Sequence, residues 1–111
     1  MVDQNTPDVS VNKLIHEQVR LAILTYLASS ETQAVQFTEL KQNLELTAGN
    51  LSVQLRKLED AGYVQIDKTI EGRKPVTSVA LTLSGLDALN VYIAKMEAII
   101  QTLKNAEVKK K

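Results

Sequence analysis

Apolar side chains recur at helical spacing in the first third of the chain. Between Lys13 and Ser30 they are spaced so that they share one face of a helix. The residues on this face are Ile15, Val19, Ala22, Ile23, Tyr26 and Leu27. A shorter amphipathic stretch from Thr38 to Leu44 follows a polar connection over residues 29–36. Phe37 is expected to begin this helix, and Thr38 is placed to cap it. The pattern predicts helices over residues 13–30 and 38–44.

A third apolar stripe lies between Thr47 and Tyr63. Leu51, Leu55 and Leu58 stack on one side when successive residues turn by about 100°. The start has a threonine at the N-cap position, and the end has a glycine, Gly62, where helices commonly stop. The residues that point away from the predicted core are Gly49, Val53, Arg56, Lys57 and Asp60. We therefore predict a third helix with a polar outer face.

The second and third helices are separated by only Glu45 and Leu46. Such a short connection requires the two helices to turn sharply on each other. This arrangement is typical of a helix-turn-helix, whose second helix enters the major groove of DNA. DNA binding is the class of function that it indicates.

Two alternating runs follow the third helix and predict a hairpin. Residues 63–70 alternate as a strand does, and the second run places Val79, Leu81 and Leu83 on one face. Between the runs, Glu71 to Pro75 forms a glycine-containing turn that a proline closes, with two basic residues at its tip. Three helices followed by a basic hairpin describe a winged helix-turn-helix. The predicted fold class is α+β, mainly α.

The last long stretch, Ser84 to Leu103, has apolar residues at spacings of 3, 4, 3, 4 and 3. These residues are Leu86, Leu89, Ile93, Met96, Ile100 and Leu103. Such a seam is typical of helices that pair with another helix, although it is short for an isolated coiled coil. We therefore expect a C-terminal dimerisation helix that is helped by the first helix.

These patterns divide the chain into four parts. Residues 1–12 are polar and are predicted to form a loose arm, and residues 13–83 form the DNA-binding domain. Residues 84–105 form the dimerisation helix, and residues 106–111 form a solvated basic tail.

Composition excludes several other classes of protein. The 111 residues suffice for one domain, and the absence of cysteine together with a single histidine argues against a metal site or another cofactor. His16 has no nucleophile near it in the sequence, so no enzyme is predicted. Neither a signal peptide nor an apolar run of membrane-spanning length is present, which predicts a cytoplasmic protein without membrane contact.

Charge leaves two classes of partner open. The thirteen basic and thirteen acidic residues cancel, and the pI near 6.6 is low for a small nucleic-acid-binding domain. A neutral protein can still present a basic stripe on one face. The alternative is a winged-helix module that binds another protein, which the acidic residues near the predicted DNA face favour. These residues are Glu59, Asp60, Asp67 and Glu71.

Four segments carry a resemblance to a known group. They are IHEQVRLAILTYL, LTAGNLSVQLRKLEDAGYV, EGRKPVT and LTLSGLDAL, which fall within Leu14 to Ile100. Together they resemble the small winged-helix transcriptional regulators related to the MarR and ArsR groups. The resemblance implies a cytoplasmic dimer with its third helix in the major groove and its wing beside it. The chain lacks the cysteine ligands of ArsR metal sensors and leaves little room for an effector pocket.

The candidate DNA-binding residues lie on the third helix and the wing. An asparagine or glutamine early in that helix can pair with adenine, and an arginine or lysine further along can meet a phosphate or a guanine edge. The competing interpretation is an ordinary solvated helix face and a charged turn. The candidates are Thr47, Asn50, Ser52, Val53, Gln54, Arg56, Lys57, Lys68, Arg73 and Lys74. We expect a homodimer that binds double-stranded DNA at a palindromic operator, with any control acting through dimer geometry.

Overall fold

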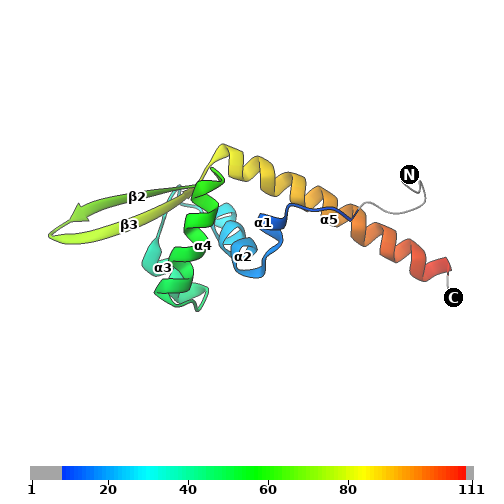
Figure 1. The fold of residues 1–111 in the computed structure, drawn as a ribbon, viewed down its shortest axis with the longest axis horizontal. Helices are drawn as coiled ribbons and strands as arrows, with labels where there is room; N and C mark the ends of the chain where they lie inside the picture. Colours follow the sequence, from blue (N-terminus) through cyan, green and yellow to red (C-terminus); the bar gives the residue numbers. More distant parts are fainter. Residues whose placement is uncertain (1–8, 110–111) are drawn as a thin grey trace.

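A computed structural model describes residues 9–109, with side chains through residue 106. These residues form five helices and three strands, and the hairpin of two strands and one long helix project from the central body in opposite directions (Figure 1). The elements are α1 (Lys13–His16), α2 (Gln18–Ser29), β1 (Val35–Gln36), α3 (Phe37–Asn43), α4 (Ala48–Asp60), β2 (Val64–Glu71), β3 (Lys74–Leu81) and α5 (Leu83–Lys109). The predicted winged helix-turn-helix is confirmed.

The hydrophobic core lies where α2, α3 and α4 meet the base of the sheet. Leu51, Leu55 and Leu58 are all buried, so the predicted inner face of the third helix is confirmed. Their neighbours in the core come from the other four described helices and from all three strands. These neighbours include Ile23, Leu24, Leu40, Val35, Val64 and Val79. The core therefore fixes α4 from one side and leaves its other side free.

The predicted helix over residues 13–30 is wrong as a single helix. The chain breaks at Glu17, whose backbone is extended, and this residue separates α1 from α2. The Glu17 carboxylate accepts hydrogen bonds from the backbone N–H groups of Val19 and Arg20, at 3.1 and 2.9 Å. The sequence did not predict that Glu17 caps a new helix, because the apolar periodicity continues across the break.

The predicted start of α3 at Phe37 is confirmed, but its predicted cap is wrong. The helix begins at Phe37 after Gln36, so Thr38 lies inside the helix and is not its cap. Residues 35 and 36, predicted as part of a connection, form β1, where Val35 pairs with Val79. Two residues are too few to show alternation, although a buried valine is consistent with a strand.

A cluster of polar side chains joins α2 to α3. The Tyr26 hydroxyl donates to Glu39 Oε2 at 2.6 Å and accepts from Asn43 Nδ2 at 3.0 Å. The hydrogen bond to the Glu39 carboxylate raises the pKa of Tyr26. These bonds hold the first helix of the helix-turn-helix against α2.

Both predicted ends of α4 are confirmed. The Thr47 hydroxyl accepts from the Asn50 backbone N–H at 3.1 Å, as an N-cap does. At the other end Gly62 has a φ of 81°, its N–H donates to Glu59 O, and the Tyr63 N–H donates to Leu58 O. This pair of bonds is a Schellman motif, which needs a left-handed residue where the glycine stands.

The wing is a regular hairpin with a two-residue turn. Strand β3 pairs with β2 from Val64↔Leu81 to Glu71↔Lys74, and the sheet order is β1-β3-β2. Gly72 and Arg73 both have positive φ, 54° and 73°, which is the pattern of a type I′ turn. The predicted turn is too long, because Pro75 lies in β3 opposite Ile70 rather than closing the turn. From Lys74 to Thr77, before Ser78, strand β3 has no partner in β1, so Pro75 lies at an edge position that can hold a proline.

Helix α5 begins immediately after the sheet. Leu83 belongs to this helix and is 82% exposed, so its predicted place on the strand face is wrong, whereas Val79 and Leu81 are buried and half-buried there. Thr82 accepts from the Gly85 N–H at 2.9 Å, which caps the helix. Gly85 touches the hairpin base so closely that a Cβ would lie 2.2 Å from Tyr63 O.

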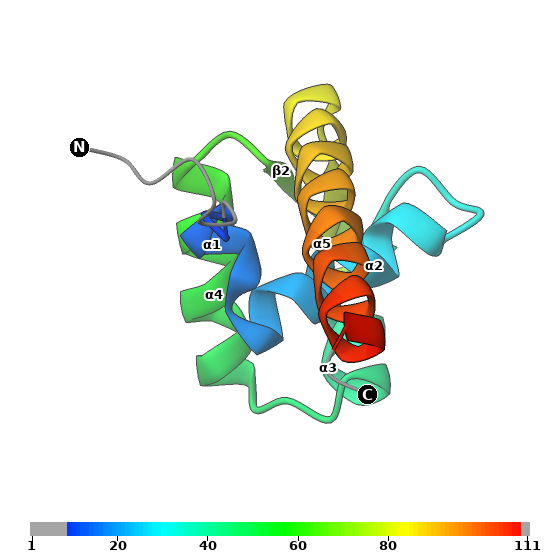
Figure 2. The same cartoon turned by 90° about the vertical axis from the view of Figure 1, so that its right-hand side faces the viewer.

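The molecule is elongated, with extents of 63 × 30 × 25 Å. Its radius of gyration is 17.6 Å, whereas a compact chain of this length has about 13 Å. Figure 2 looks along α5 and shows α1 and α4 on one side of it.

Helix α5 continues to Lys109, beyond its predicted end. Residues 1–8 of the predicted arm and residues 110–111 of the predicted tail lie outside the described residues.

Candidate nucleic-acid interface

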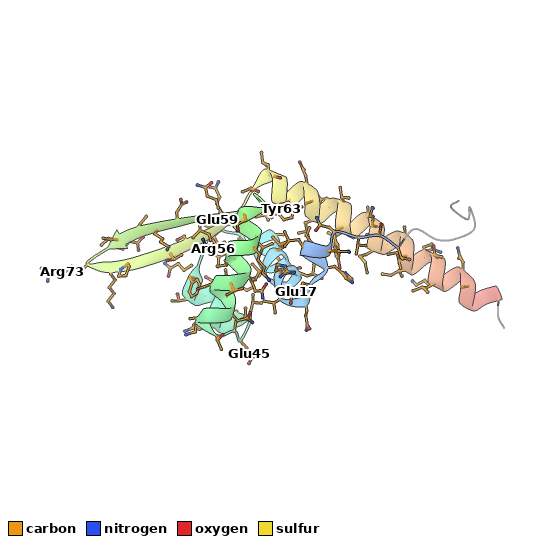
Figure 3. The ribbon with its side chains drawn as sticks, in the orientation of Figure 1. Glu17, Glu45, Arg56, Glu59, Tyr63 and Arg73 are labelled. Carbon is orange, nitrogen blue, oxygen red and sulfur yellow. The ribbon has the colours of Figure 1, made fainter. Side chains whose placement is uncertain are left out.

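The outer face of α4 presents short polar side chains first and charged ones later. Asn50 and Ser52 are exposed in the first half, with Val53 at 52%. Arg56 and Lys57 are exposed in the second half, and Figure 3 shows Arg56 on the side of α4 toward the wing. Thr47 is exposed too, although its hydroxyl is engaged as the helix cap. The helix therefore offers an uncharged N-terminal half and a basic flank.

A cleft separates α4 from the wing. Ser52 and Arg56 line it from the helix, and Lys68 and Thr77 line it from the strands. The acidic residues Glu59 and Asp60 border the same cleft, near the end of α4 that meets the hairpin. Three predicted residues of the interface, Ser52, Arg56 and Lys68, are thus brought together from two different elements, whereas Thr77 was not among the predicted residues.

The remaining basic residues lie at the far end of the hairpin. Arg73 is labelled at the tip of the wing in Figure 3, and Lys74 is the first residue of β3. Both side chains are exposed, and the neighbouring Ile70 is 78% exposed. The tip therefore combines two positive charges with an apolar side chain and lies well away from α4.

The basic side chains of this face form no ion pair within 4 Å among the described side chains. Among the side chains of residues 9–106, the ion pair within 4 Å joins Arg20 to Glu17, at 3.7 Å. None of the predicted basic residues takes part in it. The positive groups of the candidate interface are therefore available to an external partner. These groups belong to Arg56, Lys57, Lys68, Arg73 and Lys74.

Gln54 differs from the other predicted residues because its amide has partners inside the protein. Its Oε1 accepts from Arg20 Nη1 at 2.7 Å, and its Nε2 donates to Asn50 Oδ1 at 3.1 Å. The side chain is only half exposed. A role for Gln54 in direct contact with a base would require it to leave these partners.

Arg20 and Glu17 were not among the residues predicted for the site. The Arg20 side chain is 12% exposed and also donates from Nε to Leu14 O at 2.7 Å. Burial alone would raise the pKa of Glu17, but the backbone hydrogen bonds from Arg20 and Val19, with the charges of Arg20 and Lys57, bring it below its usual value. An arginine on the mainly apolar α2 was the signal in the sequence that could have indicated this network.

The predicted seam of α5 divides into two sets. Leu89 is 5% exposed in the core, and Met96 packs against the core. Tyr92, which lies outside the predicted seam, is also buried, and its hydroxyl is 2.8 Å from His16 Nδ1. The other four seam residues remain on the surface. They are Leu86 at 39%, Ile93 at 45%, Ile100 at 48% and Leu103 at 60%.

The described part of the chain was compared with the requirements of a metal site and of a membrane-spanning helix. Within it, no group of three or more histidine, cysteine, aspartate or glutamate residues is arranged to hold a metal ion. None of the described helices is long and apolar enough to cross a membrane.

Comparison with protein families identifies the family to which this arrangement of helices and strands belongs. The family model of the winged-helix DNA-binding domain matches residues 19–100, which include the helix-turn-helix, the wing and most of α5. The chain belongs to this family. This winged-helix DNA-binding protein is 36% identical over 95 residues to an uncharacterised protein of Methanocaldococcus jannaschii. The match covers 86% of this chain and 98% of the relative.

Solved structures place this winged-helix protein among transcriptional regulators. A transcriptional regulator homologue from Pyrococcus horikoshii OT3 has a TM-score of 0.74 and 31% identity, over 81% of this chain and 87% of that one. A structure from Enterococcus faecalis V583, assigned to the MarR family, has a TM-score of 0.67 and 18% identity, over 94% and 99%. An ArsR-family regulator shares the fold as well. The predicted resemblance to the MarR and ArsR groups is confirmed.

Proposed function

We propose that this transcriptional regulator binds DNA as a homodimer, with α4 of each copy in the major groove. The observation that carries the proposal is the outer face of α4, where small uncharged side chains lead and Arg56 follows. Such side chains let a helix approach base edges closely, and hydrogen bonds to those edges distinguish sequences. Asn50 and Arg56 are the two residues that we assign to direct base contact.

The wing has a different role in this proposal. Arg73 and Lys74 lie at the tip of a long hairpin, far from the apolar core, and neither has an ion pair within the described chain. Charges on such an arm suit phosphates, which attract positive groups whatever the sequence. Lys57, on the basic flank of α4, and Lys68, at the edge of the cleft, would add contacts of the same kind.

The exposed part of the α5 seam supports the dimer. Leu86, Ile93 and Ile100 are seven residues apart, so they form one apolar stripe on the outside of the helix. A seven-residue period keeps a stripe facing a second helix, and a two-fold dimer pairs the same stripe from both copies. Two α4 helices related by a two-fold axis would read a palindromic operator.

Salt dependence of binding tests this proposal against a protein partner. Binding of a duplex through several phosphates should weaken steeply as salt rises, with log Kd changing by about 0.9 per contact per tenfold change in salt. For the dimer we expect a slope of log Kd against log salt that corresponds to four or more phosphate contacts. Duplex binding that is weak and nearly independent of salt would instead favour a protein-binding module, as the acidic residues Glu59 and Asp60 suggest.

A further inference from the structure

We propose that Arg20, a residue of α2 on the inner side of α4, sets which base Asn50 prefers. The inference rests on the proposed function, because it concerns how α4 reads DNA. Arg20 Nη1 donates to Gln54 Oε1 at 2.7 Å, and Gln54 Nε2 donates to Asn50 Oδ1 at 3.1 Å. These two bonds form a relay from the protein interior to an exposed side chain on the outer face.

The direction of the relay follows from the chemistry of its first member. A guanidinium group has only donors, so the part of Gln54 that meets Arg20 must be the amide oxygen. The NH₂ group of Gln54 then has to point the other way, toward Asn50. Because that NH₂ group donates, Asn50 meets it with its own oxygen. Arg20 thus decides the orientation of two amides, and Asn50 is left with its Nδ2 group directed outward.

Arg20 is itself held in one position. Its Nε donates to Leu14 O at 2.7 Å, and its side chain is 12% exposed. Glu17 lies 3.7 Å away, and that carboxylate is fixed by the backbone N–H groups at the start of α2. Asn50 is fixed from the backbone side, where its N–H donates to the Thr47 hydroxyl. Both ends of the relay are therefore anchored.

A donor-presenting asparagine has a defined preference in the major groove. Guanine offers two acceptors there, N7 and O6, whereas cytosine offers an N4 donor. The bidentate pairing with adenine needs the oxygen and the NH₂ group of one amide to face the base together, whereas the bond from Gln54 holds the Asn50 oxygen toward Gln54. We infer that Asn50 favours guanine most and cytosine least at the base that it contacts, rather than the adenine that the sequence suggested.

Two substitutions change the relay in different ways. Arg20→Met removes the donor, so that both amides can turn, and the preference at the Asn50 base pair should fall about two- to tenfold. Arg20→Lys retains a donor-only group and should preserve the preference. Gln54→Glu keeps Arg20 paired but supplies only acceptors, so Asn50 must turn its NH₂ group inward. Its oxygen then points outward, and the preference should move toward adenine or cytosine while overall affinity drops.

The experiment is selection of duplexes from a random pool by the full chain, in parallel for the wild type and these three variants. Asn50→Ala identifies the base pair concerned, because its preference should disappear there alone. Thermal unfolding shows that each variant is folded, and Gln54→Glu keeps the test valid if Arg20→Met does not fold. The expected result is a changed preference at that base pair and unchanged preferences elsewhere.

The outcomes separate this inference from the function on which it rests. A wild-type consensus that Arg20→Met and Gln54→Glu both retain at the Asn50 base pair overturns the role of Arg20 and leaves the proposed function standing. A wild-type pool without enrichment overturns both. A preference that changes equally at every position in Arg20→Met, and also in Arg20→Lys, shows a structural role for Arg20 and overturns the inference.

Discussion

Helices α4 and α5 have the same kind of apolar stripe in the sequence but different surroundings in the structure. In α4, Leu51, Leu55 and Leu58 are at most 2% exposed. In α5, by contrast, Ile93 and Ile100 are 45% and 48% exposed, although they occupy equally regular positions. The chain itself supplies a partner for the stripe of α4, and for only part of the stripe of α5.

The comparison shows that periodicity predicts an apolar face without identifying what covers it. The covered stripe of α4 holds the helix rigidly and leaves a polar outer face for recognition. The partly uncovered stripe of α5 exposes apolar area that water solvates poorly, which favours association with another surface. The two helices therefore divide the work that we propose: α4 contacts DNA, and α5 holds two copies together.

The largest effect should come from placing charge on the uncovered stripe. In the double substitution Ile93→Asp and Ile100→Asp, each dimer loses four half-exposed apolar side chains from its interface. At roughly 1 kcal/mol for each, the dissociation constant of the dimer should rise about a thousandfold. Sedimentation at micromolar concentration should show dimers for the wild type and monomers for the variant.

Ala98→Asp is the matched control, because this exposed residue lies on the opposite side of α5 and should leave the dimer intact. Leu89 is unsuitable for the test, because it is buried in the core and its substitution would also unfold the monomer. A wild type that sediments as a monomer would mean that the uncovered stripe does not associate.

The junction between the two regions should be the most sensitive point for stability. In Gly85→Ala the new Cβ would lie 2.2 Å from Tyr63 O, so either α5 or the base of the hairpin must move. Overpacking of this kind typically costs about 1–3 kcal/mol of unfolding free energy, and backbone atoms cannot yield easily. Denaturant unfolding measures the loss. Gly49→Ala in α4 has open space around its Cβ and should be neutral or stabilising by up to about 1 kcal/mol.

The two regions that we propose to contact DNA should respond differently to the loss of one positive charge. Arg56→Ala should weaken binding to the best operator by about 1–3 kcal/mol and flatten the preference at particular base pairs. Arg73→Ala should weaken all duplexes alike and reduce the salt slope by about 0.9 per lost contact, nearly two for a dimer. Binding to matched and mismatched duplexes at several salt concentrations measures both effects.

Lys104→Ala, on the exposed C-terminal part of α5, serves as the control for charge alone. If Arg73→Ala changed base preference but left the salt slope untouched, the assigned roles of α4 and the wing would be reversed.

The smallest effect should come from Glu17, which caps α2 on the inner side of α4. The pKa of Glu17 is lowered in the folded protein, so its contribution to stability is present above the ordinary carboxylate pKa of about 4.3 and is lost as the pH falls through the folded-state value. At neutral pH, Glu17→Gln should cost about 0.5–1 kcal/mol of unfolding free energy. The difference from the wild type should shrink toward zero in acid. A difference that stayed constant from pH 7 to pH 3 would show that the charge of Glu17 contributes nothing.

Most of the fold could be predicted because its signals are local. Thr47 and Gly62 limit α4 by capping chemistry, and three leucines at helical spacing mark its buried face. The break at Glu17 could not be predicted in the same way, because the apolar pattern continues through it. The strand β1 was missed because its pairing with Val79 is a contact between distant parts of the chain.

The candidate site was predicted less completely than the fold. Residue type and helical position identified Asn50 and Arg56 on the outer face. They did not reveal that the Gln54 amide is held by Arg20, which lies 34 positions away in the sequence. Hydrogen bonds between elements depend on how the elements pack, and periodicity within one helix carries no information about them.

We propose above that two copies of this chain read DNA through α4. Selection of bound duplexes from a random pool tests it most directly, because the same sequences report both base preference and symmetry. A two-fold dimer should select a palindromic consensus whose half-sites are separated by about one helical turn, or a multiple of it. A pool that remains random after repeated rounds, or a consensus without two-fold symmetry, would contradict it.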